Sequence, residues 1–248
     1  MFSVLAKKEF SLTQKIRWLR LFMRAGYDQR FNAIIAMIYD LIPSHSPIIV
    51  DVGANVGNFT RGCTQQLKKA HLVLAIEPSH YVFPILEFWS KIWSSKSSKI
   101  ICRKNILSDN SGVSKLHTPI KVSGSLRVGL AYTGKQKHKE VYIETVQNMR
   151  LDDVLIAEGI SHVDLVKIDV EGAEENVIKG APMLLNEIRP IWYLELDDSR
   201  TAHMGNSSQR VFNCMIDAGY RAYLIDANIN PINVLSMQGN DNYLFVPN

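Results

Sequence analysis

Four acidic residues of this sequence stand at or just beyond the ends of apolar stretches that are predicted to be buried strands. They are Asp51, Glu77, Asp169 and Glu195. In a parallel α/β sheet a ligand lies across the carboxyl ends of the strands, and these side chains would converge there. Carboxylates that share a cleft repel one another and lose hydration, so a ligand that is cationic or rich in hydrogen-bond donors would compensate them. The pattern therefore predicts a cleft for such a ligand.

A glycine turn follows the first of these acids. Residues 47–60, PIIVDVGANVGNFT, predict a β-branched buried strand, a tight turn and the start of a helix. Gly53 and Gly57 carry no Cβ, so we expect the backbone of the turn to come close to a ligand beside the helix N-terminus. A dinucleotide fingerprint needs G-x-G-x-x-G and a P-loop needs Lys followed by Ser or Thr, so both fit this turn poorly.

The turn is more similar to the acidic-x-G-x-(G/N)-x-G turn of methyltransferases that use S-adenosylmethionine (SAM). A second apolar strand, 72–76, ends at Glu77, where a doubly wound fold places a carboxylate for ribose hydroxyls. Residues 162–185, HVDLVKIDVEGAEENVIKGAPMLL, resemble a segment of the FkbM-type methyltransferases. With Glu77-Pro78, ILSDNSG at 106–112 and LDD at 151–153, the resemblance covers roughly residues 47–196.

The resemblance implies SAM as the cofactor. Glu77 would bind the ribose, Asp51 and the backbone of 53–57 the methionine side, and the loop 105–108 the adenine. The expected cofactor-binding residues are Asp51, Gly53, Asn55, Gly57, Thr60, Glu77, Pro78, Asn105, Ser108 and Asp169.

Methyl transfer is an in-line displacement, and an alcohol acceptor also benefits from a base. We expect Asp169 to be that base, with Glu171 or Glu195 as alternatives. Lys167 would steer the acceptor or pair with these acids, although a plain ion pair at the strand end is also consistent with the sequence. A turn at Val170 could also gather carboxylates around Mg²⁺. This alternative stays open, although we predict no metal site. The seven histidines include no close pair, which disfavours zinc, although His80 and His203 could reach the cleft.

The elements that would position these residues alternate as strands and helices up to residue 197, which predicts a parallel sheet. An antiparallel pair at 221–226 and 242–247 would complete it. The predicted fold is α/β, a doubly wound, mostly parallel seven-stranded sheet of the Rossmann-like class I methyltransferase type. Helical periodicity with a break at Gly26 predicts an N-terminal helical extension at 1–45, before a methyltransferase domain at 46–248.

Composition narrows the setting of this fold. The 248 residues are 46% hydrophobic and 21% charged, as in an ordinary globular domain. Segment 1–45 holds seven Lys/Arg against three acids and accounts for the whole net charge of +4. Three scattered cysteines and the lack of a long apolar run predict a cytoplasmic protein without a transmembrane segment. The basic extension could cover the cleft, form a homodimer contact, or touch an anionic membrane surface.

The function that this pattern predicts is O-methylation of a hydroxyl on a sugar, a polysaccharide or another polyhydroxylated metabolite. Its acceptor class, a small molecule or a glycan, comes only from the family resemblance. Ser123, Ser125 and Arg127 could border the acceptor pocket. Two alternatives stay open, an RNA ribose methyltransferase and a catalytically silent SAM-binding scaffold. A nucleic-acid partner is disfavoured because no basic catalytic face is visible in the sequence.

Overall fold

The computed structural model describes residues 3–66, 71–201, 205–226 and 228–248. Within them, the main sheet has eight strands in the order β10-β9-β11-β8-β7-β1-β2-β3. Strands β3, β2, β1, β7 and β8 run parallel, and β11 pairs antiparallel with both β8 and β9. The strands are β1 (Ile48–Val52), β2 (His71–Ile76), β3 (Ser98–Arg103), β7 (Leu165–Ile168), β8 (Ile191–Leu196), β9 (Tyr220–Ile225), β10 (Pro231–Val234) and β11 (Asp241–Pro247).

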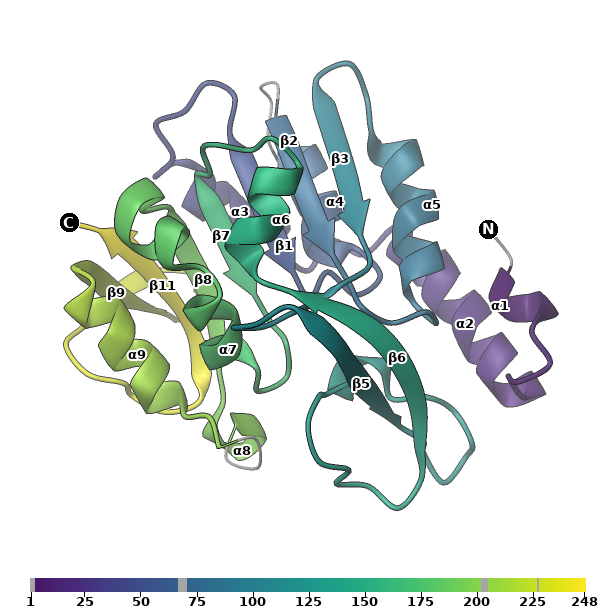
Figure 1. The fold of residues 1–248 in the computed structure, drawn as a ribbon. Coiled ribbons are helices and arrows are strands. Elements are labelled where there is room, and N and C mark those ends of the chain that lie inside the picture. The colour runs from purple at the N-terminus through teal and green to yellow at the C-terminus, as the bar shows by residue number, and fades with distance from the viewer. Residues whose placement is uncertain (1–2, 67–70, 202–204, 227) are drawn as a thin grey trace.

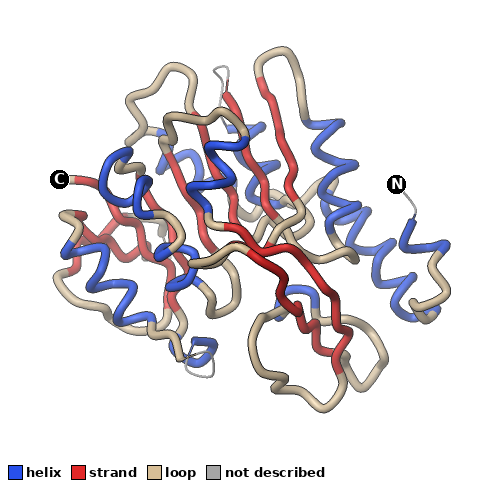
Figure 2. Tube along the Cα trace, viewed as in Figure 1, coloured by secondary structure: helices blue, strands red, loops and turns tan. Residues whose placement is uncertain are grey.

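Helices cover both faces of this sheet (Figures 1 and 2). Side chains alternate along β1, so Ile49 packs with the helices of one face while Val50 and Val52 pack with those of the other. One face carries α3 (Asn32–Tyr39), α4 (Asn58–Gln66) and α5 (Phe83–Trp93), and the other carries α6 (Leu151–Ala157), α7 (Glu174–Lys179) and α9 (Ser208–Asp217). The predicted α/β class and doubly wound arrangement are therefore confirmed.

The predicted number of seven strands is one too low for the described residues. Strand β10 is the addition, and it pairs antiparallel with residues 222–225 of β9 at the edge of the sheet. Its side chains are largely exposed, so this segment lacks the apolar run that marks a buried strand. The sequence 171–187 after β7 predicts one helix, but α7 ends at Lys179 and a separate π-helical turn, Leu184–Ile188, follows Pro182.

A second, three-stranded sheet lies beyond the carboxyl ends of the main strands (Figure 1). Its order is β4-β6-β5, and the long β5–β6 connection carries a short 3-10 helix, Val128–Leu130. Its strands are β4 (Ile106–Leu107), β5 (Gly112–Pro119) and β6 (Val141–Met149). Residues between 128 and 133 of this connection and the carboxyl ends of the main strands line a common cavity.

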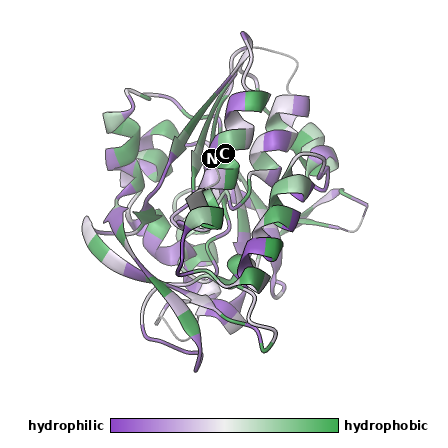
Figure 3. Ribbon diagram, turned by 90° about the vertical axis from the view of Figure 1, so that its right-hand side faces the viewer, coloured by the Kyte–Doolittle hydropathy of each residue, from purple (hydrophilic) through white to green (hydrophobic). Residues whose placement is uncertain are grey.

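The N-terminal segment forms α1 (Ser3–Ala6) and α2 (Leu12–Ala25) before α3. Ser11 caps α2 in a reciprocal capping box with Gln14. The apolar side of α2 packs on α5 and on the turn before it, where the Trp18 indole N–H donates to the Tyr81 carbonyl at 2.8 Å. Figure 3 views this side of the molecule and shows that the helices carry both hydrophobic and hydrophilic residues.

The described helices include none long and apolar enough to cross a bilayer. The division at residue 46 into an extension and a domain stays a prediction. A further short helix, α8 (Asp198–Thr201), follows β8.

Candidate active site

A cavity of about 450 Å³ opens at the carboxyl ends of the parallel strands. This volume lies within the range of small-molecule sites, roughly 300–1,000 Å³. Its floor comes from the turns after β1, β2, β3 and β7 and from β8. Its walls come from α2, the α2–α3 connection and the β5–β6 connection. The predicted site residues that line it are Gly53, Asn55, Glu77, Pro78, Asn105, Lys167, Asp169, Glu171 and Glu195.

The glycine turn has positive φ angles at Gly53 (73°), Asn55 (52°) and Gly57 (91°). A Cβ on Gly53 would lie 1.9 Å from the carbonyl oxygen of Asp169, and one on Gly57 would lie 2.8 Å from the Trp93 ring. Both glycines are therefore required by close contacts within the protein. The approach of this backbone to a ligand stays a prediction, and of the two glycines Gly53 lines the cavity.

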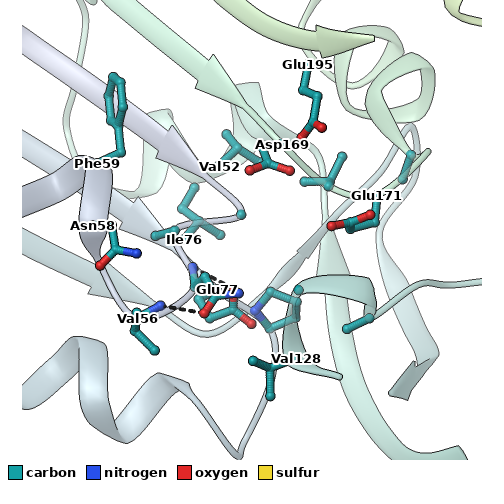
Figure 4. Close-up of a pocket in the computed structure, with 18 of the residues that line it drawn as sticks. Val52, Val56, Asn58, Phe59, Ile76, Glu77, Val128, Asp169, Glu171 and Glu195 are labelled. Atoms are coloured by element: carbon teal, nitrogen blue, oxygen red, sulfur yellow. Dashed lines mark hydrogen bonds between the residues drawn. The ribbon is translucent and has the colours of Figure 1, made fainter. Parts of the chain in front are cut away.

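Glu77 lies at the end of β2 and is held by the backbone. Its Oε2 accepts the N–H of Asn55 and its Oε1 accepts the N–H of Ser79, both at 2.9 Å. Burial raises the pKa of this carboxyl to about 7, although the two backbone hydrogen bonds oppose the shift. Figure 4 shows Glu77 on the same cavity as Asp169. Each carboxylate oxygen keeps a lone pair for a hydroxyl donor.

Lys167 is a residue of β7, and its side chain binds the glycine turn that follows β1. Its Nζ donates to the carbonyl oxygens of Val52 (3.3 Å) and Gly53 (3.0 Å) and lies 3.3 Å from Asp51 Oδ1. Burial opposes the charged form, but Asp51 and Asp169 outweigh it and raise the pKa of Lys167. The side chain is thus a fixed ammonium that holds the turn in place.

Four predicted cofactor residues do not line the cavity: Asp51, Gly57, Thr60 and Ser108. Asp51 is fully buried, and its Oδ2 accepts the Thr60 hydroxyl at 2.7 Å and the Thr60 N–H at 3.1 Å. Ser108 donates its N–H to the Met149 carbonyl at 3.0 Å. These four residues do not face the cavity, and the hydrogen bonds between Asp51 and Thr60 join the end of β1 to α4.

The three acids Asp169, Glu171 and Glu195 form one side of the cavity, which we call the acidic floor (Figure 4). Burial, the charge of Asp169 and a hydrogen bond with Asp169 raise the pKa of Glu195 to about 7. Burial and the charge of Asp169 also raise the pKa of Glu171 to about 8, despite the ion pair of Glu171 with Arg200 at 2.7 Å. Lys167 lies 3.6 Å from Asp169. The three crowded acids of the floor are therefore not all ionised at neutral pH.

Arg200 of α8 binds this floor and was not foreseen from the sequence. Its guanidinium lies 3.2 Å from Glu195 and 2.9 Å from Asp197, in addition to Glu171. Glu171 has a left-handed backbone (φ 58°), and a Cβ on the adjacent Gly172 would lie 2.4 Å from the Arg200 carbonyl oxygen. The turn therefore places Glu171 next to Arg200. The described residues contain no cluster of three His, Cys, Asp or Glu side chains suited to a metal ion.

Three arginines from the N-terminal segment also line the cavity: Arg17, Arg24 and Arg30. We call them the arginine wall. The expectation that this segment could cover the cleft is confirmed. Arg17, Leu21 and Arg24 recur at i, i+4 and i+7, so the face was visible in the sequence but had been treated only as a basic polar surface.

Other expectations about the walls differ from the structure. The β5–β6 connection lines the cavity with residues between 128 and 133, but Ser123, Ser125 and Arg127 do not line it. His80 lies 3.6 Å from Glu144 and does not line the cavity. His203 lies outside the described residues.

This topology and the acid-ended strands around the cavity define a Rossmann-like class I methyltransferase fold. The family model described as the methyltransferase FkbM domain matches residues 51–222, and the chain belongs to this family. Methyltransferases of the family use SAM as the methyl donor.

Solved structures agree with the fold. The chain is similar to methyltransferase FkbM from Methylobacillus flagellatus KT, at 15% identity and a TM-score of 0.54, covering 93% of this chain but only 59% of that one. It is also similar to magnesium protoporphyrin IX methyltransferase from Synechocystis PCC 6803 with bound SAM, at 12% identity and a TM-score of 0.50, covering 99% and 96%. A comparison with curated proteins found no match.

Proposed function

We propose that this protein transfers the methyl group of SAM to a hydroxyl of a sugar, a polysaccharide or another polyhydroxylated metabolite. The observation that carries the proposal is the single cavity that joins Glu77, held by two backbone N–H groups, to the acidic floor. Glu77 is suited to ribose hydroxyls. The acidic floor is suited to a sulfonium and to an acceptor hydroxyl that loses its proton. The acceptor class rests on the family.

Residues of the turns divide the cofactor among them. Glu77 accepts hydrogen bonds from the ribose hydroxyls, since each of its oxygens keeps a free lone pair. Asn105 and Pro78 border the adenine side, and the backbone of Gly53 and Asn55 borders the methionine side. Asp51, Gly57 and Thr60 act on the cofactor indirectly, because they fix the turn without facing the cavity. Bound SAM would supply an electrophilic methyl carbon on a positive sulfur.

Asp169 is the best-placed base on the acidic floor. Its side chain is 34% exposed, more than that of Glu195 or Glu171, and Glu171 is already bound by Arg200. With SAM bound, the acceptor oxygen would form the new O–C bond as the S–C bond broke, the bonding pair would stay on sulfur, and Asp169 would accept the hydroxyl proton. Lys167 positions Asp169 and the turn, which fits a supporting role better than contact with the acceptor.

Two measurements test this function. Isothermal titration should show one SAM bound per chain, and SAM with a labelled methyl group should transfer its label to a polysaccharide or small-metabolite fraction. The labelled product should resist mild alkali, because a methyl ether does so and a methyl ester does not. Label in RNA alone would favour a ribose methyltransferase, and SAM binding without transfer to any fraction would favour a silent scaffold.

A further inference from the structure

The arginine wall carries more positive charge than its surroundings neutralise. Arg24 Nε lies 3.3 Å and Arg30 Nη2 lies 2.7 Å from the same oxygen of Asp28, so two guanidinium groups share one carboxylate. Arg17 has no ion pair within the described part of the chain. The wall therefore has an excess of two positive charges beside the cavity.

Arg17 also has an unmet hydrogen bond. Its Nε is buried and finds no acceptor among the residues that the structure describes. Buried polar groups in folded proteins almost always have a partner, and leaving a donor unpaired costs about 1–3 kcal/mol. Because Arg17 lines the cavity, an anionic group bound there could supply the missing acceptor.

The origin of the wall separates it from the cofactor site. The FkbM match covers residues 51–222, and every turn that we assign to SAM lies within it. The wall comes from α2 and the α2–α3 connection, which precede that match. A wall outside the matched domain is suited to a ligand other than SAM, and the acceptor is that ligand.

We propose that the arginine wall binds a carboxylate or phosphate group carried by the acceptor whose hydroxyl is methylated. Guanidinium groups form strong, charge-assisted hydrogen bonds with both anions, often through two parallel N–H donors. Such an acceptor would be an acidic or phosphorylated sugar, with its anion on the wall and its hydroxyl over the acidic floor. This proposal rests on the proposed function and names its substrate class.

Isothermal titration provides the test. The protein saturated with S-adenosylhomocysteine, and separately the free protein, is titrated with glucuronate, glucose 6-phosphate and glucose. At least one of the two anionic sugars should bind at least tenfold more tightly than glucose. The one that binds more tightly shows whether the wall prefers a carboxylate or a phosphate. Arg17→Gln and Arg24→Gln should each weaken that anion at least fivefold while SAM affinity changes less than twofold. Arg24→Gln keeps Asp28 paired with Arg30.

Arg20→Gln is the matched control, since Arg20 lies on the same helix, is exposed and does not line the cavity. It should leave anion binding unchanged. Glucose binding as tight as either anion, no binding of either anion, or equal effects of Arg20→Gln and Arg17→Gln would overturn the proposal. A loss of SAM affinity in Arg17→Gln would assign the wall to the cofactor's carboxylate instead. Because the free protein is also titrated, a failure to bind SAM would count against the proposed function and leave the anion result readable.

Discussion

The acidic floor and the arginine wall face one cavity but are built in opposite ways. The floor consists of three acids at the ends of central strands, partly buried and crowded enough to raise the pKa of Glu195 and Glu171. The wall consists of arginines on α2 and the α2–α3 connection, with Arg24 61% and Arg30 48% exposed, and a single acid, Asp28, pairs with both of these two. The floor acids favour their protonated forms because they are buried and crowded, whereas the wall has fewer acids than arginines.

This difference divides the tasks of a methyltransferase. The floor is fixed by the sheet register and by Lys167, so its geometry is suited to a reaction that needs precise alignment. Two arginines of the wall, Arg17 and Arg24, belong to an amphipathic helix whose other side packs on α5. Substitutions on its polar side therefore leave the packing intact, so the wall can be adapted to an acceptor without disturbing the chemistry.

The largest effect should come from Gly53→Ala, which tests how firmly the floor is fixed. The new Cβ would lie 1.9 Å from the Asp169 carbonyl oxygen, on a residue whose φ is 73°. We expect the free energy of unfolding to fall by about 3 kcal/mol or more, and SAM binding to become undetectable. Urea unfolding and isothermal titration measure the two effects.

Gly129→Ala is the control for stability, because nothing lies within 4 Å of its Cβ position. If Gly53→Ala were as stable as Gly129→Ala, the contact between the glycine turn and β7 would not exist as described.

Asp169→Asn should give the next largest effect, because it removes the proposed base from the floor and leaves the wall unchanged. General-base catalysis typically contributes a factor of about 10²–10⁴, so we expect kcat to fall by about a thousandfold with SAM affinity within about threefold. Single-turnover assays with labelled SAM measure the first and isothermal titration the second. Glu187→Gln, an exposed acid outside the cavity, serves as control. Equal losses of turnover and SAM affinity would argue against the base role.

Glu77→Gln tests whether the cofactor uses the floor side of the cavity. Glutamine keeps one acceptor for the backbone but loses the charge-assisted contact with ribose, which is worth about 1.5–3 kcal/mol. The SAM dissociation constant should therefore rise by about ten- to a hundredfold, measured by titration. Glu144→Gln removes a neighbouring buried acid that does not line the cavity and should leave the affinity nearly unchanged. The same affinity in both variants would mean that the ribose lies elsewhere.

The two regions also differ in how much of each could be predicted from the sequence. The acids of the floor end strands with clear apolar patterns, so their convergence followed from the rule for parallel sheets. The sequence could not show that Asp51 faces Thr60 instead of the cavity, because that depends on how the turn folds back over β7. Arg200 had no signal, since α8 is short and polar. The arginine wall depends on how α2 docks on α5, a long-range contact that periodicity alone does not specify.

The pH dependence of SAM binding should show the smallest effect and should report on the acids of the cavity, because burial brings the pKa of Glu77 into the neutral range. The pKa of Glu77 is raised to about 7, so the group is mostly protonated at pH 6 and ionised at pH 8. If the ionised form binds ribose, one such group makes SAM bind about tenfold more tightly at pH 8 than at pH 6, with a proton released on binding at pH 6.

Titrations in buffers of different ionisation enthalpy measure that proton, and Glu77→Gln should reduce the pH dependence. The unliganded protein should respond in the opposite direction. Its folded state holds the Glu77 proton more tightly than the unfolded chain does between pH 4.5 and 7, so Glu77 lowers the free energy of unfolding as the pH rises through that window. A SAM affinity that fell as the pH rose would show that a protonated acid, and not a carboxylate, meets the cofactor.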